Sequence, residues 1–340
     1  MNVKLVGLAL VLICLTILAL VYQNYLVSNK PRKARYYCAI SPQDYDNASI
    51  TNLNQAKFLQ HLDIVKDIGF DGVVLHRVES FYAEGKLDWV FNECNERNLT
   101  VMLAIYYFNL SQTFPYDYTN LQTWNKTGFM IDNAEFNLFV EWLQNISDIA
   151  ISHPNFKGYI LFYVFQHEMR DFWMEQINTT NYEKRMQILI SALNDSKPLY
   201  LTAEPWGAEN STKDVYQYLP KNFTGVDGFA LQGYNFIIDD IQFYLVEEQK
   251  NYWSKYFNEI HIAEFGYRTI QNEYTHGRAS SEEAKARMIR EFIKRTWSWD
   301  SFVCYFGLTD FPPDGLDWGL IYDNGTYKLS AYAFKELLKK

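Results

Sequence analysis

Short apolar runs alternate with amphipathic helical stretches along most of the chain, and this alternation limits the choice of fold more than any other feature. Between the runs, apolar residues recur at helical spacing, as in Phe58, Leu62 and Val65. Eight runs have the length and residue types of strands: 36–41, 72–76, 100–106, 158–165, 198–203, 226–231, 260–264 and 302–308. Strands that alternate with helices predict parallel pairing through right-handed crossovers.

Eight such units close naturally into a barrel, and 340 residues suit a single large α/β domain. An open doubly wound sheet is the alternative, but no glycine-rich phosphate-binding motif follows any of the strands. Helical windows support the alternation near 136–146, 181–193, 240–257, 281–298 and 329–338. We therefore predict one (β/α)8 TIM barrel over residues 36–340, preceded by one N-terminal transmembrane helix.

The N-terminal segment, residues 1–22, is predicted to be a membrane anchor or signal segment. Residues 5–22 carry no charge and are just long enough to cross a bilayer as a helix. No small-x-small cleavage site follows, which favours a retained anchor over a secretory signal. Residues 23–35 form a short polar and basic linker. If the segment were cleaved, the protein would be secreted.

The orientation of this anchor is predicted from glycosylation sequons. Basic residues after the span outnumber those before it, so the positive-inside rule would place the large domain inside. Ten Asn-x-Ser/Thr sequons oppose this, at Asn47, Asn98, Asn109, Asn125, Asn145, Asn178, Asn194, Asn210, Asn222 and Asn324. Because large domains can be translocated despite flanking charge, we predict a single-pass cell-surface glycoprotein with its large domain outside.

Composition narrows the class of ligand. A net charge of −9 argues against nucleic acid, which requires a concentrated basic surface. Aromatic residues make up 17% of the chain and serve either as packing or as platforms for sugar rings. Together these features favour a globular acidic protein with an uncharged ligand.

The cysteines do not form a disulfide framework or a metal-binding spacing. Cys14 lies in the predicted span, which leaves Cys38, Cys94 and Cys304 scattered along the domain. Cys38 and Cys304 fall in the first and last strands, which are neighbours in a closed barrel. A disulfide between them is one alternative, and buried free thiols are the expectation.

Two glutamates carry the strongest functional signal. Glu168, in Gln-His-Glu-Met at 166–169, and Glu264, in Ala-Glu-Phe-Gly at 263–266, each close an apolar strand. A carboxylate at such a place is costly to bury without a purpose. In a barrel both strand ends face one pocket, and paired carboxylates there are what cleavage of a glycosidic bond requires.

Other chemistries fit the sequence less well. The six histidines are scattered, and His167-Glu168 lacks the second histidine that a zinc protease helix needs, so no metal is expected. No Gly-x-Ser-x-Gly elbow is present, which argues against a serine hydrolase. Two carboxylates need no cofactor, and we expect none.

These motifs resemble those of clan A of the glycoside hydrolases, which are (β/α)8 barrels. Ile-Ala-Glu-Phe-Gly at 262–266 is similar to the motif around the clan's nucleophile after strand seven. The sequence His-Glu-Met at 167–169, after strand four, is similar to family 26 and departs from the commoner Asn-Glu-Pro. The C-terminal stretches 305–310, 318–321 and 323–326 resemble family 5 instead. The resemblance covers about 35–340.

The resemblance implies roles for five residues. Glu168 would be the acid/base and Glu264 the nucleophile. His167 would position the sugar 2-hydroxyl, Tyr234 would hydrogen-bond the nucleophile, and Arg77 would lie near it, although its spacing is about three residues longer than in the clan.

Three further residues are candidates for substrate binding. Glu204, in Ala-Glu-Pro-Trp at 203–206, is a rival acid, because Glu-Pro is similar to the common clan motif. Choosing it would leave the barrel one strand short, so we interpret it as a carboxylate lining the cleft. Trp206 and Trp318 are candidate sugar platforms or ordinary packing residues.

The sequence therefore predicts a membrane-anchored retaining glycoside hydrolase that cleaves a β-linked glycan. Its partners would be a polysaccharide or oligosaccharide of β-mannan or β-glucan type, and the membrane through residues 5–22. A carbohydrate-binding or surface protein built on a catalytically degenerate barrel is the alternative, because a fold alone does not establish activity. A glycan-stabilised structural protein would explain the sequons but not the two glutamates.

Overall fold

The strands pair in sequence order into a closed parallel barrel, as the alternating pattern predicts. The computed structural model describes residues 31–41, 55–106, 133–164, 179–193, 195–203, 221–233, 243–269, 279–310 and 317–339. The strands are β1 Arg35–Ile40, β2 Gly72–Leu75, β3 Thr100–Tyr106, β4 Phe156–Val164, β5 Leu199–Ala203, β6 Gly228–Gln232, β7 Glu259–Phe265 and β8 Phe302–Tyr305. The (β/α)8 prediction is confirmed for the domain.

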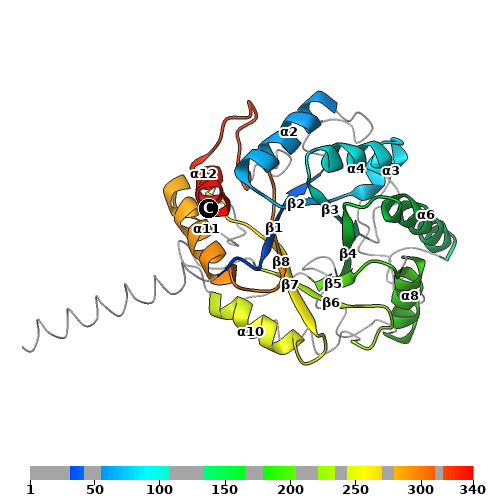
Figure 1. The fold of residues 1–340 in the computed structure, drawn as a ribbon. Coiled ribbons are helices and arrows are strands. Elements are labelled where there is room, and N and C mark those ends of the chain that lie inside the picture. The colour runs from blue at the N-terminus through cyan, green and yellow to red at the C-terminus, as the bar shows by residue number, and fades with distance from the viewer. Residues whose placement is uncertain are drawn as a thin grey trace, which may run out of the picture.

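Helices surround this barrel on the outside (Figure 1). Those in the described ranges are α2 Gln55–Ile68, α3 Val78–Ala83, α4 Leu87–Glu96, α6 Asn133–Ile151, α8 Thr179–Ala192, α10 Phe243–Trp253, α11 Glu282–Thr296 and α12 Leu329–Leu338. The helical windows predicted from sequence all coincide with helices. Sequence reasoning missed α3 and α4, although Leu87, Val90, Phe91 and Cys94 of α4 are buried at helical spacing.

Aromatic side chains join the helices to the outer face of the barrel. Trp253 at the end of α10 stacks on Phe229 of β6, with 3.8 Å between ring centroids. Phe292 of α11 stacks in the same way on Phe265 of β7 at 4.1 Å. Part of the high aromatic content therefore serves packing between helix and sheet, which was one of the two roles predicted for the aromatic residues.

The barrel interior is filled by side chains from alternate strand positions, as expected for a small barrel. The buried interior residues are Tyr37, Ala39, Val74, Met102, Ala104, Ile160, Phe162, Tyr200, Ala230, Ala263, Phe302 and Cys304. Gly72 of β2 lies against the large ring of Tyr37. A Cβ there would lie 2.7 Å from that ring and 2.2 Å from the carbonyl oxygen of Thr100, so a larger residue would push the strands apart.

The three cysteines of the domain are buried free thiols, as expected. Cys304 faces the barrel interior, whereas Cys38 belongs to the layer between strands and helices. Tyr37 is the residue of β1 that lies opposite Cys304 in the register of the two strands. The side chains of Cys38 and Cys304 therefore point to opposite faces of the sheet, and the alternative of a disulfide between them is wrong.

The predicted membrane span, residues 5–22, lies outside the described residues. None of the helices in the described ranges is long and apolar enough to cross a bilayer. Four sequon asparagines fall within these ranges, namely Asn98, Asn145, Asn222 and Asn324, and all four are exposed. Their side chains are accessible to a glycosylating enzyme, and glycosylation itself stays a prediction.

Candidate active site at the carboxyl ends of the strands

A bulge near the end of β7 turns Glu264 toward the barrel interior. In a regular strand Ala263 and Phe265 would face the same side, but Ala263 lies inside the barrel and Phe265 packs outside it. The register with β6 and β8 shifts at this point. Such an extra residue re-aims the side chains that follow it. Oε1 of Glu264 consequently lies 3.7 Å from Nε2 of His76, which follows β2.

Glu264 is almost fully enclosed, with 5% of its surface exposed. Its backbone carbonyl accepts a 2.7 Å hydrogen bond from the N–H of Gly233 after β6, which ties the bulge to the neighbouring strand. Burial raises the pKa of the Cys304 thiol well above its ordinary value, and the nearby charges of Cys38 and Glu264 add to this shift. Cys304 belongs to the barrel interior, so Glu264 lies next to the apolar core, at the carboxyl-terminal end of the barrel.

His76 contacts Glu264 as a neutral ring. Burial lowers the pKa of His76 to about 3, and the adjacent charge of Arg77 acts in the same direction. The ring is held edge-on by Phe162 at 6.3 Å and Phe306 at 5.8 Å between centroids. The uncharged imidazole of His76 therefore lies near the Glu264 carboxylate without forming an ion pair with it.

Thr202 and Gln232 extend this polar layer to β5 and β6. Alternation places both inside the barrel, two residues after the interior Tyr200 and Ala230, and both are fully buried. Thr202 Oγ1 and Gln232 Nε2 make no hydrogen bond to the described part of the chain. Buried polar atoms of this kind need a partner, and a hydroxyl-rich ligand or water at the barrel mouth would supply one.

Sequence reasoning missed His76, Thr202 and Gln232 as site residues. Their signal was the alternation within each strand, because a polar residue follows an inward apolar one by two positions.

Arg77 is near the site but is turned differently from His76. It has left-handed backbone angles, φ 49° and ψ 47°, directly before α3, and its side chain is partly exposed. The residue whose side chain contacts Glu264 is His76, one position earlier. The role of Arg77 near the nucleophile stays a prediction.

Trp318 packs closely on the segment that follows Glu264. A Cβ added to Gly266 would lie 3.1 Å from its ring, and Phe306 meets it edge-on at 5.9 Å. The guanidinium of Arg268 lies over the ring, 5.4 Å from its centroid. Trp318 is 8% exposed, so much of its ring serves packing, and its role as a sugar platform stays a prediction.

The segment around Trp318 is held by a buried lysine. Nζ of Lys285 in α11 donates to the carbonyl oxygens of Asp317 and Gly319, at 2.8 and 2.9 Å. The Asp317 carboxylate in turn accepts a 2.8 Å hydrogen bond from the N–H of Thr269, in the segment after β7. Burial lowers the pKa of Lys285 to about 8. These bonds fix the backbone on both sides of Trp318.

The remaining predicted site residues, His167, Glu168, Glu204, Trp206 and Tyr234, lie outside the described residues. Their assigned roles stay predictions. Within the described ranges, no three His, Cys, Asp or Glu side chains lie together as a metal site would need.

Comparison with known proteins supports the fold. No family model matches the sequence, and no curated protein matches it either. A GH5_18 enzyme from Streptomyces cattleya, solved in complex with Manβ1-4GlcNAc, superposes with a TM-score of 0.64 at 15% identity over 91% of this chain and 80% of that chain. A β-glucosidase from Thermotoga maritima superposes with a TM-score of 0.60 at 10% identity over 92% and 99%.

The chain has the fold of the clan A glycosidases. Both comparison proteins are (β/α)8 enzymes of that clan, so the predicted resemblance is confirmed at the level of fold. Family 5 is represented among the matching structures, whereas the likeness to family 26 stays a prediction. In this clan fold, Glu264 occupies the end of strand seven, which is where the sequence resemblance placed the nucleophile.

The buried histidines of this fold predict a loss of stability in mild acid. Burial lowers the pKa of His76 to about 3 and those of His61 and His261 to about 4, from an ordinary value of 6.5. Below pH 6.5 the unfolded chain binds protons that the folded chain does not. The free energy of unfolding should therefore fall as the pH drops from about 6.5 to about 4.

Urea denaturation at pH 7.5 and at pH 5 measures this effect. His76→Gln should flatten the pH dependence by up to about 1.4 kcal/mol per pH unit, since one proton is removed from the linkage. A free energy of unfolding that is the same at both pH values would show that these histidines become protonated in the folded state.

Proposed function

We propose that the chain is a retaining β-glycosidase with Glu264 as its nucleophile. The observation that carries the proposal is the bulge in β7, which turns a buried carboxylate into the mouth of a barrel with a clan A glycosidase fold. A structural carboxylate would not need this reorientation, because a helix cap or surface ion pair would form without it.

In the proposed mechanism, Glu264 attacks the anomeric carbon while Glu168 protonates the leaving oxygen. The resulting glycosyl-enzyme is hydrolysed when Glu168 acts as base on a water molecule, so the anomeric configuration is retained. The assignment of Glu168 rests on the sequence. The neutral ring of His76 lies 3.7 Å from the Glu264 carboxylate and can orient it without adding a positive charge. Gln232 is the residue of β6 that pairs with Glu264 in the strand register.

The proposed substrate is an oligosaccharide with a terminal or internal β-mannosyl unit. Two observations support this choice over β-glucan: the sequence His-Glu-Met at 167–169, and the likeness to GH5_18 structures from Streptomyces cattleya and Bifidobacterium longum solved with Manβ1-4GlcNAc. The buried polar atoms of Thr202 and Gln232 would meet the hydroxyls of such a ligand.

The proposed location is the cell surface, with residues 5–22 in the membrane. Residues 31–34 lead into Arg35, the first residue of β1, and the start of this parallel strand lies at the end of the barrel opposite to Glu264. An anchor attached there would leave the catalytic end free to meet a glycan. The exposure of the four described sequon asparagines agrees with this location.

The experiment that tests the function is a substrate panel with the purified full chain. Manβ1-4GlcNAc, 4-nitrophenyl β-mannoside and 4-nitrophenyl β-glucoside are incubated with the protein, and ¹H NMR follows the anomer released first. We expect release of β-mannose before mutarotation. Absence of release by a folded protein that still binds one of these sugars would favour the carbohydrate-binding alternative.

A further inference from the structure

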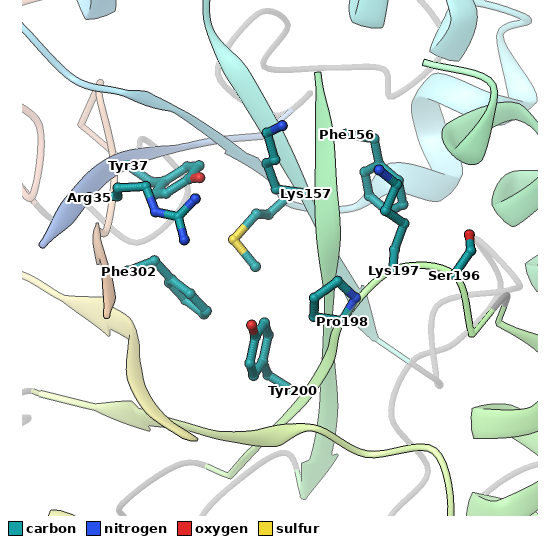
Figure 2. A pocket seen from close by; sticks show the side chains of 10 residues that line it. Arg35, Tyr37, Phe156, Lys157, Ser196, Lys197, Pro198, Tyr200 and Phe302 are labelled. Carbon is teal, nitrogen blue, oxygen red and sulfur yellow. The ribbon is translucent and has the colours of Figure 1, made fainter. Parts of the chain in front are cut away.

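A pocket of about 310 Å³ lies at the N-terminal end of the barrel. Its lining includes Arg35, Phe156 and Phe302, which are the first residues of β1, β4 and β8. Figure 2 shows Arg35, Tyr37 and Phe302 on one side of this pocket, with residues 196–198 facing them. The strands are parallel, so this pocket and Glu264 lie at opposite ends of the barrel.

The barrel core separates this pocket from the candidate active site. Ala39, Val74, Ala104, Ile160 and Cys304 fill the interior between the two ends, and all are buried. A ligand in the pocket would therefore not be in contact with Glu264.

The floor of the pocket is apolar and rigid. Phe302 packs edge-on against Tyr37 and Tyr200, with ring centroids 6.1 and 5.1 Å apart, and His261 stacks on it at 4.4 Å. Met102 lies beside these rings and is also buried. The floor thus offers aromatic and thioether surface to a flat apolar group.

Three cationic side chains line the same pocket. Arg35 is exposed, and Lys157 and Lys197 are half-buried. None of the three forms an ion pair with a carboxylate of the described ranges. The Lys157 ammonium donates a long 3.4 Å hydrogen bond to the carbonyl of Pro154. In a chain with a net charge of −9, this is a local concentration of positive charge.

Two carboxylates near the pocket, Glu259 and Asp227, accept hydrogen bonds from other groups of the protein. Glu259 accepts a 3.2 Å hydrogen bond from the hydroxyl of Tyr200 and lies 3.3 Å from Nε2 of His261. Asp227 accepts a 2.9 Å hydrogen bond from the N–H of Leu199. These contacts hold the two carboxylates in place without cancelling their charge. Neither carboxylate forms an ion pair with Arg35, Lys157 or Lys197, and the three cations outnumber them.

We infer that this pocket binds a phosphate monoester carried on an aromatic or other flat apolar group. The apolar part would lie on Phe302 and Met102, and the phosphate would be met by Arg35, Lys157 and Lys197. A dianion matches a cluster of three cations better than a carboxylate does, and Arg and Lys both bind phosphate oxygens through charge-assisted hydrogen bonds.

Isothermal titration calorimetry of the purified full chain with phenyl phosphate tests this site. Inorganic phosphate and phenol, titrated at the same ionic strength, separate the two halves of the ligand. We expect saturable binding of phenyl phosphate that is at least about tenfold tighter than that of either fragment. Equal affinities for phenyl phosphate and inorganic phosphate would overturn the inference, because the apolar floor would then contribute nothing.

Lysine variants test whether phenyl phosphate binds in this pocket. Lys157→Ala/Lys197→Ala should weaken binding of phenyl phosphate by about tenfold or more, with Lys197→Gln as a milder change if the double variant does not fold. Lys66→Ala, at an exposed position of α2, should bind as the wild type does. Unchanged affinity in a folded lysine variant, or loss of binding in Glu264→Gln, would overturn the proposed site, the latter by placing the ligand at the active site.

Discussion

Replacing Glu264 by glutamine is expected to lower kcat on the best β-glycoside of the panel by a factor on the order of 10⁴ to 10⁶. The amide has almost the same shape as the carboxylate, but it is a far weaker nucleophile. Because an uncharged group replaces a carboxylate in a nearly closed site, we expect the fold to persist. Initial rates of wild type and variant, with binding of the same sugar measured separately, give the effect.

The matched control is Glu291→Gln. Glu291 lies on the surface of α11, where it forms an ion pair with Arg295, so the same chemical change there should leave kcat unaltered. If the Glu264 variant kept more than about a tenth of wild-type activity, Glu264 would not be the nucleophile, because general effects of polarity alone are smaller than the loss of a covalent step.

The largest loss of stability near the site is expected for Phe265→Ala, at about 3–5 kcal/mol in the free energy of unfolding. Phe265 is fully buried, stacks on Phe292 and meets Tyr305 and Phe334. Removing the ring leaves a cavity between β7 and α11. It also removes the outward anchor of the bulge, so kcat should fall together with stability. Urea denaturation and initial rates measure the two effects.

Tyr332→Ala provides the control for this stability prediction. Tyr332 lies on α12 with 53% of its surface exposed, so truncation there should change the free energy of unfolding by no more than about 0.5 kcal/mol. If Phe265→Ala cost less than about 1 kcal/mol, the outer layer would have collapsed around the missing ring, and Phe265 would not be what holds the bulge.

The regular part of the fold was predictable because each strand and most helices carry a local pattern. The eight strands appear as apolar runs, and the helices of the later units appear as amphipathic windows. Two helices between β2 and β3 were missed for different reasons. α3 has only six residues, too few to display a helical period, whereas the buried Leu87, Val90, Phe91 and Cys94 of α4 do follow one, so α4 was predictable from the sequence.

The candidate site was only partly predictable, because its geometry depends on an irregularity. In a strand with a strict period of two, Ala263 and Glu264 would face opposite sides of the sheet, so only one of them could point into the barrel. The bulge arises where β7 must pair with both β6 and β8, and a single sequence does not display that register. The family motif points to Glu264 as the nucleophile, but it does not explain how the side chain reaches the barrel mouth.

The neighbour of Glu264 shows the same limit. The resemblance to clan A suggested Arg77 near the nucleophile, which stays a prediction, but it gave no role to His76, whose ring lies 3.7 Å from the Glu264 carboxylate. The position of His76 directly after β2 continues the inward alternation of that strand, and the left-handed backbone of Arg77 ends it. Which residue after β2 lies near Glu264 depends on backbone angles, and the residue types alone do not determine these angles.

The most direct test of Glu264 as the nucleophile is to trap the covalent intermediate. The full chain is incubated with 2-deoxy-2-fluoro-β-mannosyl fluoride, digested, and its peptides are analysed by mass spectrometry. We expect one fluoromannosyl group per chain, attached to Glu264. A label on another residue, or rapid hydrolysis of β-mannosides without any trapped sugar and with inversion at the anomeric carbon, would contradict this assignment.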